Sequence, residues 1–322
     1  MGGGGIDRRP LARQRRIGSD AVMSERPAFD RRRFLAAGAA WAPFAGLLPG
    51  EAAAPRFSAG RRRLKLSLAA YSFRDHLDGK KKPAFDLPAF VDRAAALDVD
   101  AVELTEYWFP KPPGHDWVTA IKRRCHLAGV DISCAPMRSD LTVTGDQERA
   151  EQIGAIRSWL EVAALLGAPA VRVFAGNQKK GQSVEEAESR CIEALREAAV
   201  EAARVGIFLA LENHGGIVAE SSALLRIVAA VDSPWVAINL DTGNFHTDDP
   251  YADFAACASL AVAVQVKTRV QRRGKAPEMP DIARFMGILR DAGYRGAVAL
   301  EYEGDAAIEE VPWRLGELRR HL

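Results

Sequence analysis

The sequence predicts a single parallel (β/α)8 barrel preceded by a leader, and three observations support this fold class. From residue 64 onward, short apolar runs alternate with longer amphipathic segments. Eight such repeats fit into about 260 residues, which is the usual size of a closed eight-stranded barrel. Successive runs also share a face on which a small residue precedes a polar one. With 322 residues, 48% of them hydrophobic, the chain is long enough to bury the core that this architecture needs.

The eight apolar runs have the length and the β-branched content of buried strands. In chain order they read KLSLAAYSF, AVELTEYW, DISCAPM, AVRVFAG, FLALENH, VAINLDTGN, AVAVQVKT and AVALEYEG. A doubly wound open sheet is the alternative, but it rarely needs eight strand–helix units. The sequence YSFRDHL stands at the end of the first run, where dinucleotide-binding sheets carry a glycine-rich fingerprint. This difference favours the barrel.

The segments between the runs show the periodicity of amphipathic helices and carry start and stop signals. Asp86 with Pro88 predicts one helix start, and Ser183 with Glu186 predicts another. The glycines expected to end helices are Gly129, Gly167, Gly206 and Gly293. The four cysteines lie in apolar helical or strand patterns without a C-x-x-C pair, so we expect buried structural thiols.

Residues 1–54 differ from the remaining chain and are predicted to be a twin-arginine signal peptide with a disordered leader. They carry nine arginines against five acidic residues, whereas the predicted barrel domain, residues 55–322, carries 35 basic and 37 acidic residues. Arg31 and Arg32 precede a mild apolar run, and AAA at 52–54 offers a cleavage site, which resembles the twin-arginine export signal. A basic disordered tail is the alternative, and Met23 is a second candidate start. The prediction is a periplasmic or secreted protein.

The leader and the charge balance also exclude two classes of partner. The apolar run of the leader is too short to serve as a permanent membrane anchor. Because the basic excess belongs to the leader, the barrel shows no sign of nucleic-acid binding. The sequence leaves the oligomeric state open.

One face of the predicted strands changes from small to polar toward the end of each strand. Because alternate strand residues share a face, this face is expected to point into the barrel and to place its polar groups at one mouth. The series, one for each of six strands, are as follows: Ala101 and Glu103; Ala170 and Arg172; Ala210, Glu212 and His214; Asn239 and Asp241; Ala263, Gln265 and Lys267; Ala299, Glu301 and Glu303. So many buried charges need a cation, a substrate or one another.

Three of the acids in these series come from the predicted strands five, six and eight, which predicts a metal site. Glu212, Asp241 and Glu301, with the amide of Gln265, would offer four oxygen-rich ligands to one divalent cation. Such hard ligands favour Mn²⁺ or Mg²⁺, with Co²⁺ or Zn²⁺ as alternatives. The competing interpretation is an internal salt-bridge network that uses Arg172 and Lys267.

At these positions the chain resembles the sugar phosphate isomerase/epimerase family of xylose isomerase-like barrels, which includes ketose 3-epimerases and inosose dehydratases. LENHGG, LDTGN and LEYEG resemble the segments in which family members place metal-binding carboxylates, here Glu212, Asp241 and Glu301. VQVKT resembles the His-x-Lys segment of strand seven, with Gln265 at the histidine position. Asn244 likewise stands where epimerases of the family often have histidine.

The resemblance implies an enediolate mechanism on a small carbohydrate. Glu212 and Glu301 would transfer the proton, and Lys267 would neutralise the developing oxyanion. The residues expected to contact substrate are His214, Glu103, Arg172, Trp108 and Asn244. For Glu103, pairing with Arg172 is an equal alternative, and the aromatic side chains near Trp108 would either stack on a sugar or pack their own loop.

The leading functional prediction is an exported, divalent-metal-dependent sugar isomerase or epimerase. The same enediolate can expel a β-oxygen, so a metal-dependent lyase or dehydratase acting on 3-keto-glycosides is the close alternative. A non-catalytic periplasmic sugar-binding protein is the alternative outside the enzymes, and Gln265 in the predicted metal site is what suggests it.

Overall fold

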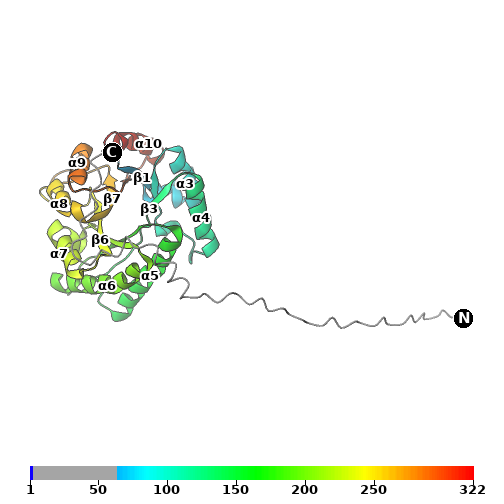
Figure 1. Cartoon of the computed structure of the whole chain (residues 1–322), viewed down its shortest axis with the longest axis horizontal. Coiled ribbons are helices and arrows are strands. Elements are labelled where there is room, and N and C mark those ends of the chain that lie inside the picture. Colours follow the sequence, from blue (N-terminus) through cyan, green and yellow to red (C-terminus); the bar gives the residue numbers. More distant parts are fainter. Residues whose placement is uncertain (3–63) are drawn as a thin grey trace, which may run out of the picture. The chain divides into compact units, whose positions relative to one another are not determined.

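The structure is a computed structural model, and it describes residues 1–2 and 64–322. The predicted leader, with its arginine pair and cleavage site, lies outside the described residues. In the described part, eight parallel strands form one sheet that closes on itself, and helices surround it as a ring (Figure 1). The predicted fold class is therefore confirmed.

The strands follow one another around the barrel in chain order, and every pairing in the sheet is parallel. They are β1 (Lys65–Ala69), β2 (Ala101–Glu103), β3 (Asp131–Cys134), β4 (Ala170–Phe174), β5 (Phe208–Glu212), β6 (Val236–Asp241), β7 (Ala261–Lys267) and β8 (Ala297–Glu301). Between β3 and β4 the barrel is closed by backbone hydrogen bonds from Ala135 N to Ala170 O (2.9 Å) and from Met137 N to Arg172 O (3.0 Å).

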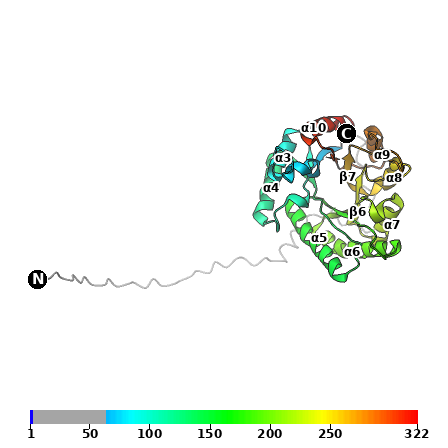
Figure 2. The same ribbon diagram turned by 180° about the vertical axis from the view of Figure 1, so that it is seen from behind.

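The helices of the outer ring are seen from the opposite side in Figure 2. They are α2 (Arg74–Leu77), α3 (Leu87–Ala96), α4 (His115–Leu127), α5 (Asp146–Leu166), α6 (Val184–Val205), α7 (Ser221–Val231), α8 (Pro250–Cys257), α9 (Ile282–Asp291) and α10 (Ala307–Arg319). Among the described residues, no helix combines the length and the apolar character needed to cross a bilayer.

Local signals explain where several of these helices begin and end. Asp86 caps α3, since its carboxylate accepts a hydrogen bond from Ala89 N (2.9 Å). Ser183 and Glu186 form a reciprocal capping box at the start of α6. Gly206 ends α6 in the left-handed conformation, with φ of 72°, which costs glycine little. These predicted starts and this stop are confirmed.

The barrel has two apolar layers of different sizes. The larger layer fills the space between the strands and the helices. The smaller one lies inside the barrel, where the small inward residues pack together: Cys134, Ala170, Ala210 and Ala263. All four cysteines of the chain are buried and free, as expected. The interior below the polar mouth is thus closed by small side chains rather than by large ones.

Candidate functional site

The polar groups of the inward face lie together at the carboxyl end of the barrel. The buried members, from six strands, are Glu103, Arg172, Glu212, Asp241, Gln265, Lys267 and Glu301. Active sites of this fold lie at this end, because the loops that follow the strands gather there. The structure therefore brings every inward acid and cation of the prediction to one mouth.

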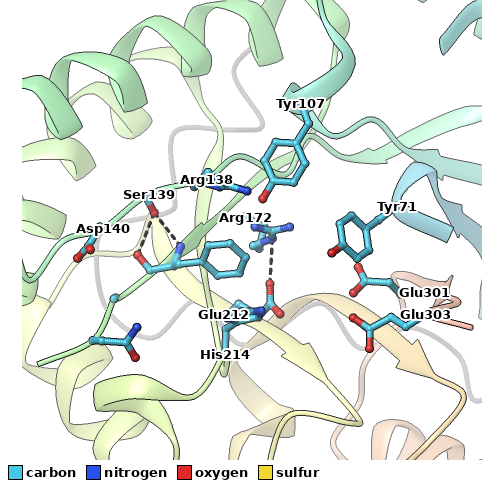
Figure 3. Close-up of a pocket in the computed structure, with 13 residues that line it drawn as sticks. Tyr71, Tyr107, Arg138, Ser139, Asp140, Arg172, Glu212, His214, Glu301 and Glu303 are labelled. Atoms are coloured by element: carbon cyan, nitrogen blue, oxygen red, sulfur yellow. Dashed lines mark hydrogen bonds and ion pairs between the residues drawn. The ribbon is translucent and has the colours of Figure 1, made fainter. Parts of the chain in front are cut away.

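A cavity of about 310 Å³ opens at this mouth. In Figure 3, Glu212 and His214 lie on one side of the cavity, and Glu301 and Glu303 lie on the other, below Tyr71. The two carboxylates predicted to transfer a proton thus approach the same space from β5 and from β8.

On the first side, one acid meets one cation. Arg172 Nε lies 2.9 Å from Glu212 Oε2, and both side chains are almost fully buried. Phe174 supports the pair, since the Arg172 guanidinium lies 4.0 Å from the centre of its ring and His214 packs against the same ring at 4.2 Å. We call Arg172, Glu212, His214 and Phe174 the Arg172 half of the site.

Burial shifts the ionisation of this half. It raises the pKa of Glu212 to about 7, although Arg172 opposes the shift. Burial also opposes the charge of Arg172, but Glu212 raises the pKa of the guanidinium above its ordinary value. Desolvation, followed by the charges of Lys267 and Arg172, lowers the pKa of His214 to about 4, so the imidazole is neutral near pH 7.

On the other side, one ammonium lies among three acids. Lys267 Nζ is 3.0 Å from Glu303 Oε1, 3.5 Å from Glu301 Oε1 and 3.7 Å from Asp241 Oδ2. We call these four residues the Lys267 half. Burial opposes the charge of Lys267, but Asp241 and then Glu301 raise its pKa above the ordinary value. Burial likewise raises the pKa of Asp241 well above that of an ordinary carboxyl.

Asn244 connects the two halves. Its Nδ2 donates a hydrogen bond to Glu212 Oε1 (2.9 Å), and its Oδ1 accepts one from Lys267 Nζ (3.0 Å). Asn244 and Lys267 line a neighbouring hollow of about 740 Å³, and Glu303 borders both this hollow and the cavity. The amide therefore fixes the distance between an acid of one half and the cation of the other.

Gln265 and Glu103 lie below the cavity in a separate hydrogen-bonded chain. Gln265 Nε2 donates to Glu103 Oε2 (2.8 Å), and Gln265 Oε1 accepts from Asn239 Nδ2 (2.7 Å). Burial raises the pKa of Glu103 to about 8, with the hydrogen bond from Gln265 opposing it. Both atoms of the Gln265 amide are thus used within the protein.

This arrangement does not fit the predicted divalent cation. A metal bound by Glu212, Asp241, Gln265 and Glu301 would need free oxygen atoms from all four. Arg172 already lies against Glu212, Lys267 lies near Asp241 and Glu301, and the Gln265 amide is engaged with its neighbours. Within residues 64–322, no three His, Cys, Asp or Glu side chains are grouped as a metal site requires.

The predicted substrate contacts fall into two groups. Arg172 and His214 line the cavity, and Asn244 lines the hollow beside it. Glu103 and Trp108 do not line the cavity. The partner of Glu103 is Gln265 rather than Arg172, and the indole of Trp108 donates to Asp78 Oδ1 (2.8 Å).

The sequence offered the aromatic side chains near Trp108 as either a sugar-stacking surface or loop packing, but it did not single out Tyr71 or Tyr107. These two tyrosines form the aromatic wall of the cavity, and Trp108 packs against both rings from outside, at 6.3 and 5.7 Å between centroids. Arg138, which the sequence also did not single out, lies over the Tyr107 ring at 5.1 Å. Tyr71 and Tyr107 come just after β1 and β2, and this position after a barrel strand is the signal that could have identified them.

A family model described as a xylose isomerase-like TIM barrel matches residues 91–319 of the chain. No curated protein matches. The fold is similar to that of D-psicose 3-epimerase with D-tagatose from Clostridium cellulolyticum H10, with 17% identity and a TM-score of 0.62 over 80% of this chain and 95% of that chain. It is also similar to apo 3-keto-D-glucoside 4-epimerase, YcjR, from E. coli, with 15% identity and a TM-score of 0.63 over 80% of this chain and 100% of that chain.

A third similar structure is the IolI protein with a bound zinc atom, with 15% identity and a TM-score of 0.67 over 80% of this chain and 99% of that chain. These solved structures thus include sugar epimerases and one metal-bound protein. At such identities, the likeness to each of them shows the fold alone.

Proposed function

The chain belongs to the xylose isomerase-like TIM barrel family, and from this premise we propose that it is a carbohydrate isomerase or epimerase that works through an enediolate. The observation that carries the proposal is the position of two carboxylates, Glu212 and Glu301, on opposite sides of one cavity (Figure 3). A proton removed on one side of a bound sugar can then be returned on the other.

The proposed step needs a sugar with a carbonyl group next to a carbon that bears hydrogen and hydroxyl. One carboxylate removes the hydrogen as a proton, the C–H electron pair becomes the C=C bond, and the carbonyl oxygen takes the negative charge. The second carboxyl group, in its acid form, then protonates carbon from the opposite face. Arg172 lines the cavity as a permanent cation and is the donor that we assign to the oxyanion.

The Lys267 ammonium, predicted as the oxyanion partner, lies behind Glu301 and Glu303 in this arrangement. We therefore assign the oxyanion to Arg172 and give Lys267 a different role below. No step of the proposed reaction passes through a metal ion, because each of the three predicted carboxylate ligands already has a protein cation within 4 Å.

The proposed substrates are free ketoses and keto-glycosides. Two structures of similar fold support this class, one a D-psicose 3-epimerase with D-tagatose and the other a 3-keto-D-glucoside 4-epimerase. The mixed wall of Tyr71, Tyr107 and Arg172 is suited to the apolar face and hydroxyl groups of a sugar.

A lyase acting on 3-keto-glycosides is the second candidate. Glu303 favours it, because this third carboxylate lines the cavity beside Glu301 and its side chain is 45% exposed. An acid there would protonate an oxygen that leaves from the enediolate. A sugar-binding protein without catalysis is the third candidate, and it predicts binding without any exchange of carbon-bound hydrogen.

The test is incubation with ketoses and 3-keto-glycosides in D₂O, followed by NMR. Deuterium incorporation with a new epimer or isomer supports the proposal, and release of the aglycone identifies the lyase. Saturable binding without exchange overturns both enzyme candidates. The control variant is Glu309→Gln, an exposed acid on α10, which should react as the wild type does.

We also propose that the protein is exported through the twin-arginine route, which the arginine pair at 31–32 and the AAA segment at 52–54 support. N-terminal sequencing of periplasmic material should begin near Pro55. Recovery of cytoplasmic protein that starts at Met1 or Met23 would contradict the proposal.

A further inference from the structure

The Lys267 ammonium lies beside two of the carboxylates that a divalent cation would have to bind. It contacts Asp241 and Glu301, two of the acids predicted to bind metal, at 3.7 and 3.5 Å. A divalent cation bound by both of these acids at about 2.0–2.4 Å would stand within a few ångströms of the ammonium. Two positive charges that close repel strongly in a buried site, so the ammonium and the metal compete for the same oxygens.

Three consecutive residues hold Lys267 in this place. Thr242 Oγ1 accepts a hydrogen bond from Lys267 N (3.0 Å), and Asn244 Oδ1 accepts one from its Nζ (3.0 Å). Between them, Gly243 leaves room for the side-chain stem, since a Cβ at this position would lie 2.8 Å from both Cβ and Cδ of Lys267. The φ of Gly243 is not in the left-handed region, so the glycine is needed here for space. The segment 242–244 thus holds the Lys267 side chain in position, and we call it the Lys267-binding segment.

The sheet register places Lys267, rather than Gln265, beside the last predicted ligand. In the ladder between β7 and β8, Lys267 pairs with Glu301 and Gln265 pairs with Ala299. Gln265 is fully buried, and its oxygen accepts the hydrogen bond from Asn239. A metal ligated by that oxygen would have to share it with the buried Asn239 amide.

Two buried acceptor atoms favour a bound divalent cation instead. Asp241 Oδ2 and Glu212 Oε2 are buried and have no hydrogen bond. A divalent cation could satisfy both, but each already has a protein cation within 4 Å: Lys267 for Asp241, and Arg172 for Glu212. A metal would therefore have to displace or be repelled by charges that the fold holds in place.

We propose that the Lys267 ammonium replaces the divalent cation in this site, so that the acids of the Lys267 half are held by an internal charge and the protein acts without a bound metal. The inference rests on the proposed function for the chemistry that these acids serve. Its prediction of metal content stands independently, because metal binding is measured without substrate.

The test compares wild-type protein with Lys267→Met, Lys267→Gln and the double variant Gln265→His/Lys267→Met. Metal content after purification is measured by elemental analysis, and Mn²⁺ affinity by calorimetry. The wild type should carry much less than one equivalent of metal and show no saturable Mn²⁺ binding below about 1 mM. Removal of the ammonium should tighten Mn²⁺ binding by about tenfold or more, and the added histidine should tighten it further.

The matched control is Lys275→Met, which removes an exposed ammonium from the loop after β7 and should leave Mn²⁺ binding as in the wild type. Circular dichroism shows whether each variant folds. If neither Lys267 variant folds, the metal content of the wild type still decides the question. One equivalent of tightly bound metal in the wild type, or equal Mn²⁺ affinity in the wild type and a folded Lys267 variant, would overturn the inference.

The inference and the proposed function can fail separately. If the purified protein contains stoichiometric metal and exchanges carbon-bound hydrogen in D₂O, the proposed function is supported and the inference about Lys267 is wrong. Absence of both metal and exchange would support the inference and remove the function. If both hold, the exchange rate should be unchanged by EDTA.

Discussion

The two halves of the site balance their charges in different ways. In the Arg172 half, one acid is matched by one guanidinium at 2.9 Å, and the guanidinium packs against the Phe174 ring at 4.0 Å. In the Lys267 half, one ammonium lies near three acids at distances from 3.0 to 3.7 Å, and the nearest of them, Glu303, is half exposed. The ion pair of the first half is almost fully buried, whereas the second half is a partly exposed cluster.

This difference indicates how the two halves divide the work. Arg172 keeps its charge beside Glu212 and is packed against Phe174, so it is suited to meeting an oxyanion at a fixed place. An excess of acids around one cation leaves carboxylates free to take up protons or to bind hydroxyl groups. The comparison therefore assigns electrostatic stabilisation to the Arg172 half, and it places one proton-transfer acid in each half.

The largest expected effect tests the division of proton transfer between the halves. Glu212→Gln and Glu301→Gln should each reduce epimerisation by about 10²–10⁴-fold, because each removes the acid–base group on one side of the substrate. Each variant should still exchange deuterium into the epimer whose hydrogen faces the remaining carboxylate. NMR in D₂O, started from each epimer in turn, measures this. Equal loss of exchange from both epimers in both variants would show that one carboxylate serves both faces.

The next effect tests the buried ion pair of the Arg172 half. Arg172→Met leaves Glu212 buried without its cation and should destabilise the protein by about 3–5 kcal/mol, measured by urea unfolding. The control, Arg157→Met, breaks an ion pair with Glu197 at 3.0 Å whose side chains are 49% and 42% exposed, and it should cost about 1 kcal/mol or less.

The cost of Arg172→Met should also depend on pH. The pKa of Glu212 in the fold, about 7, is above that of an ordinary carboxyl, so the stability that its proton contributes is present at low pH and lost as pH rises through 7. A protonated Glu212 needs no cation beside it. The variant should therefore be less destabilised at pH 5 than at pH 8, and an equal cost at both would contradict the assignment of this pKa.

A smaller effect tests whether the Lys267-binding segment, residues 242–244, positions Lys267. Gly243→Ala places a Cβ 2.8 Å from the lysine stem and from Arg269 O, and the forced movement should cost about 1–3 kcal/mol. Gly287→Ala in α9 is the control, since nothing lies within 4 Å of its new Cβ, and it should be neutral or stabilising. If both substitutions have equal effects on unfolding, the space at Gly243 is not what positions Lys267.

The strands and the polar mouth could be predicted because both follow from alternation along a strand. Burial fixes the apolar face, and the remaining face must point into the barrel. The partners of each polar group could not be predicted, because they depend on register between strands. At Ile238 and Asn239 the ladder from β6 to β7 shifts, which sets Asp241 opposite Gln265. A separate ladder, from β7 to β8, pairs Lys267 with Glu301. That shift in register cannot be inferred from the identity of the inward-facing residues.

The sequence did not single out the tyrosines of the aromatic wall, and the reason is different. Alternation ends where a strand ends, and a short 3-10 turn, Glu106–Trp108, follows β2 and decides which of two adjacent rings turns toward the cavity. That turn directs Tyr107 inward and leaves Trp108 to pack from outside and donate to Asp78. No periodic pattern distinguishes neighbouring residues in such a turn, so the sequence could not show which of the two rings faces the cavity.

The smallest expected effect tests whether Tyr107 or Trp108 contacts the substrate. Tyr107→Phe removes a hydroxyl from the cavity wall and should raise KM for a sugar substrate by about 5–30-fold, as expected for one lost hydrogen bond of about 1–2 kcal/mol. Trp108→Phe keeps an aromatic ring behind the wall and loses only its bond to Asp78, so KM should change by less than about threefold. Steady-state kinetics of the two variants measures the difference. A larger change in KM for Trp108→Phe than for Tyr107→Phe would reverse the assignment, because it would mean that the indole, rather than the phenol, reaches the substrate.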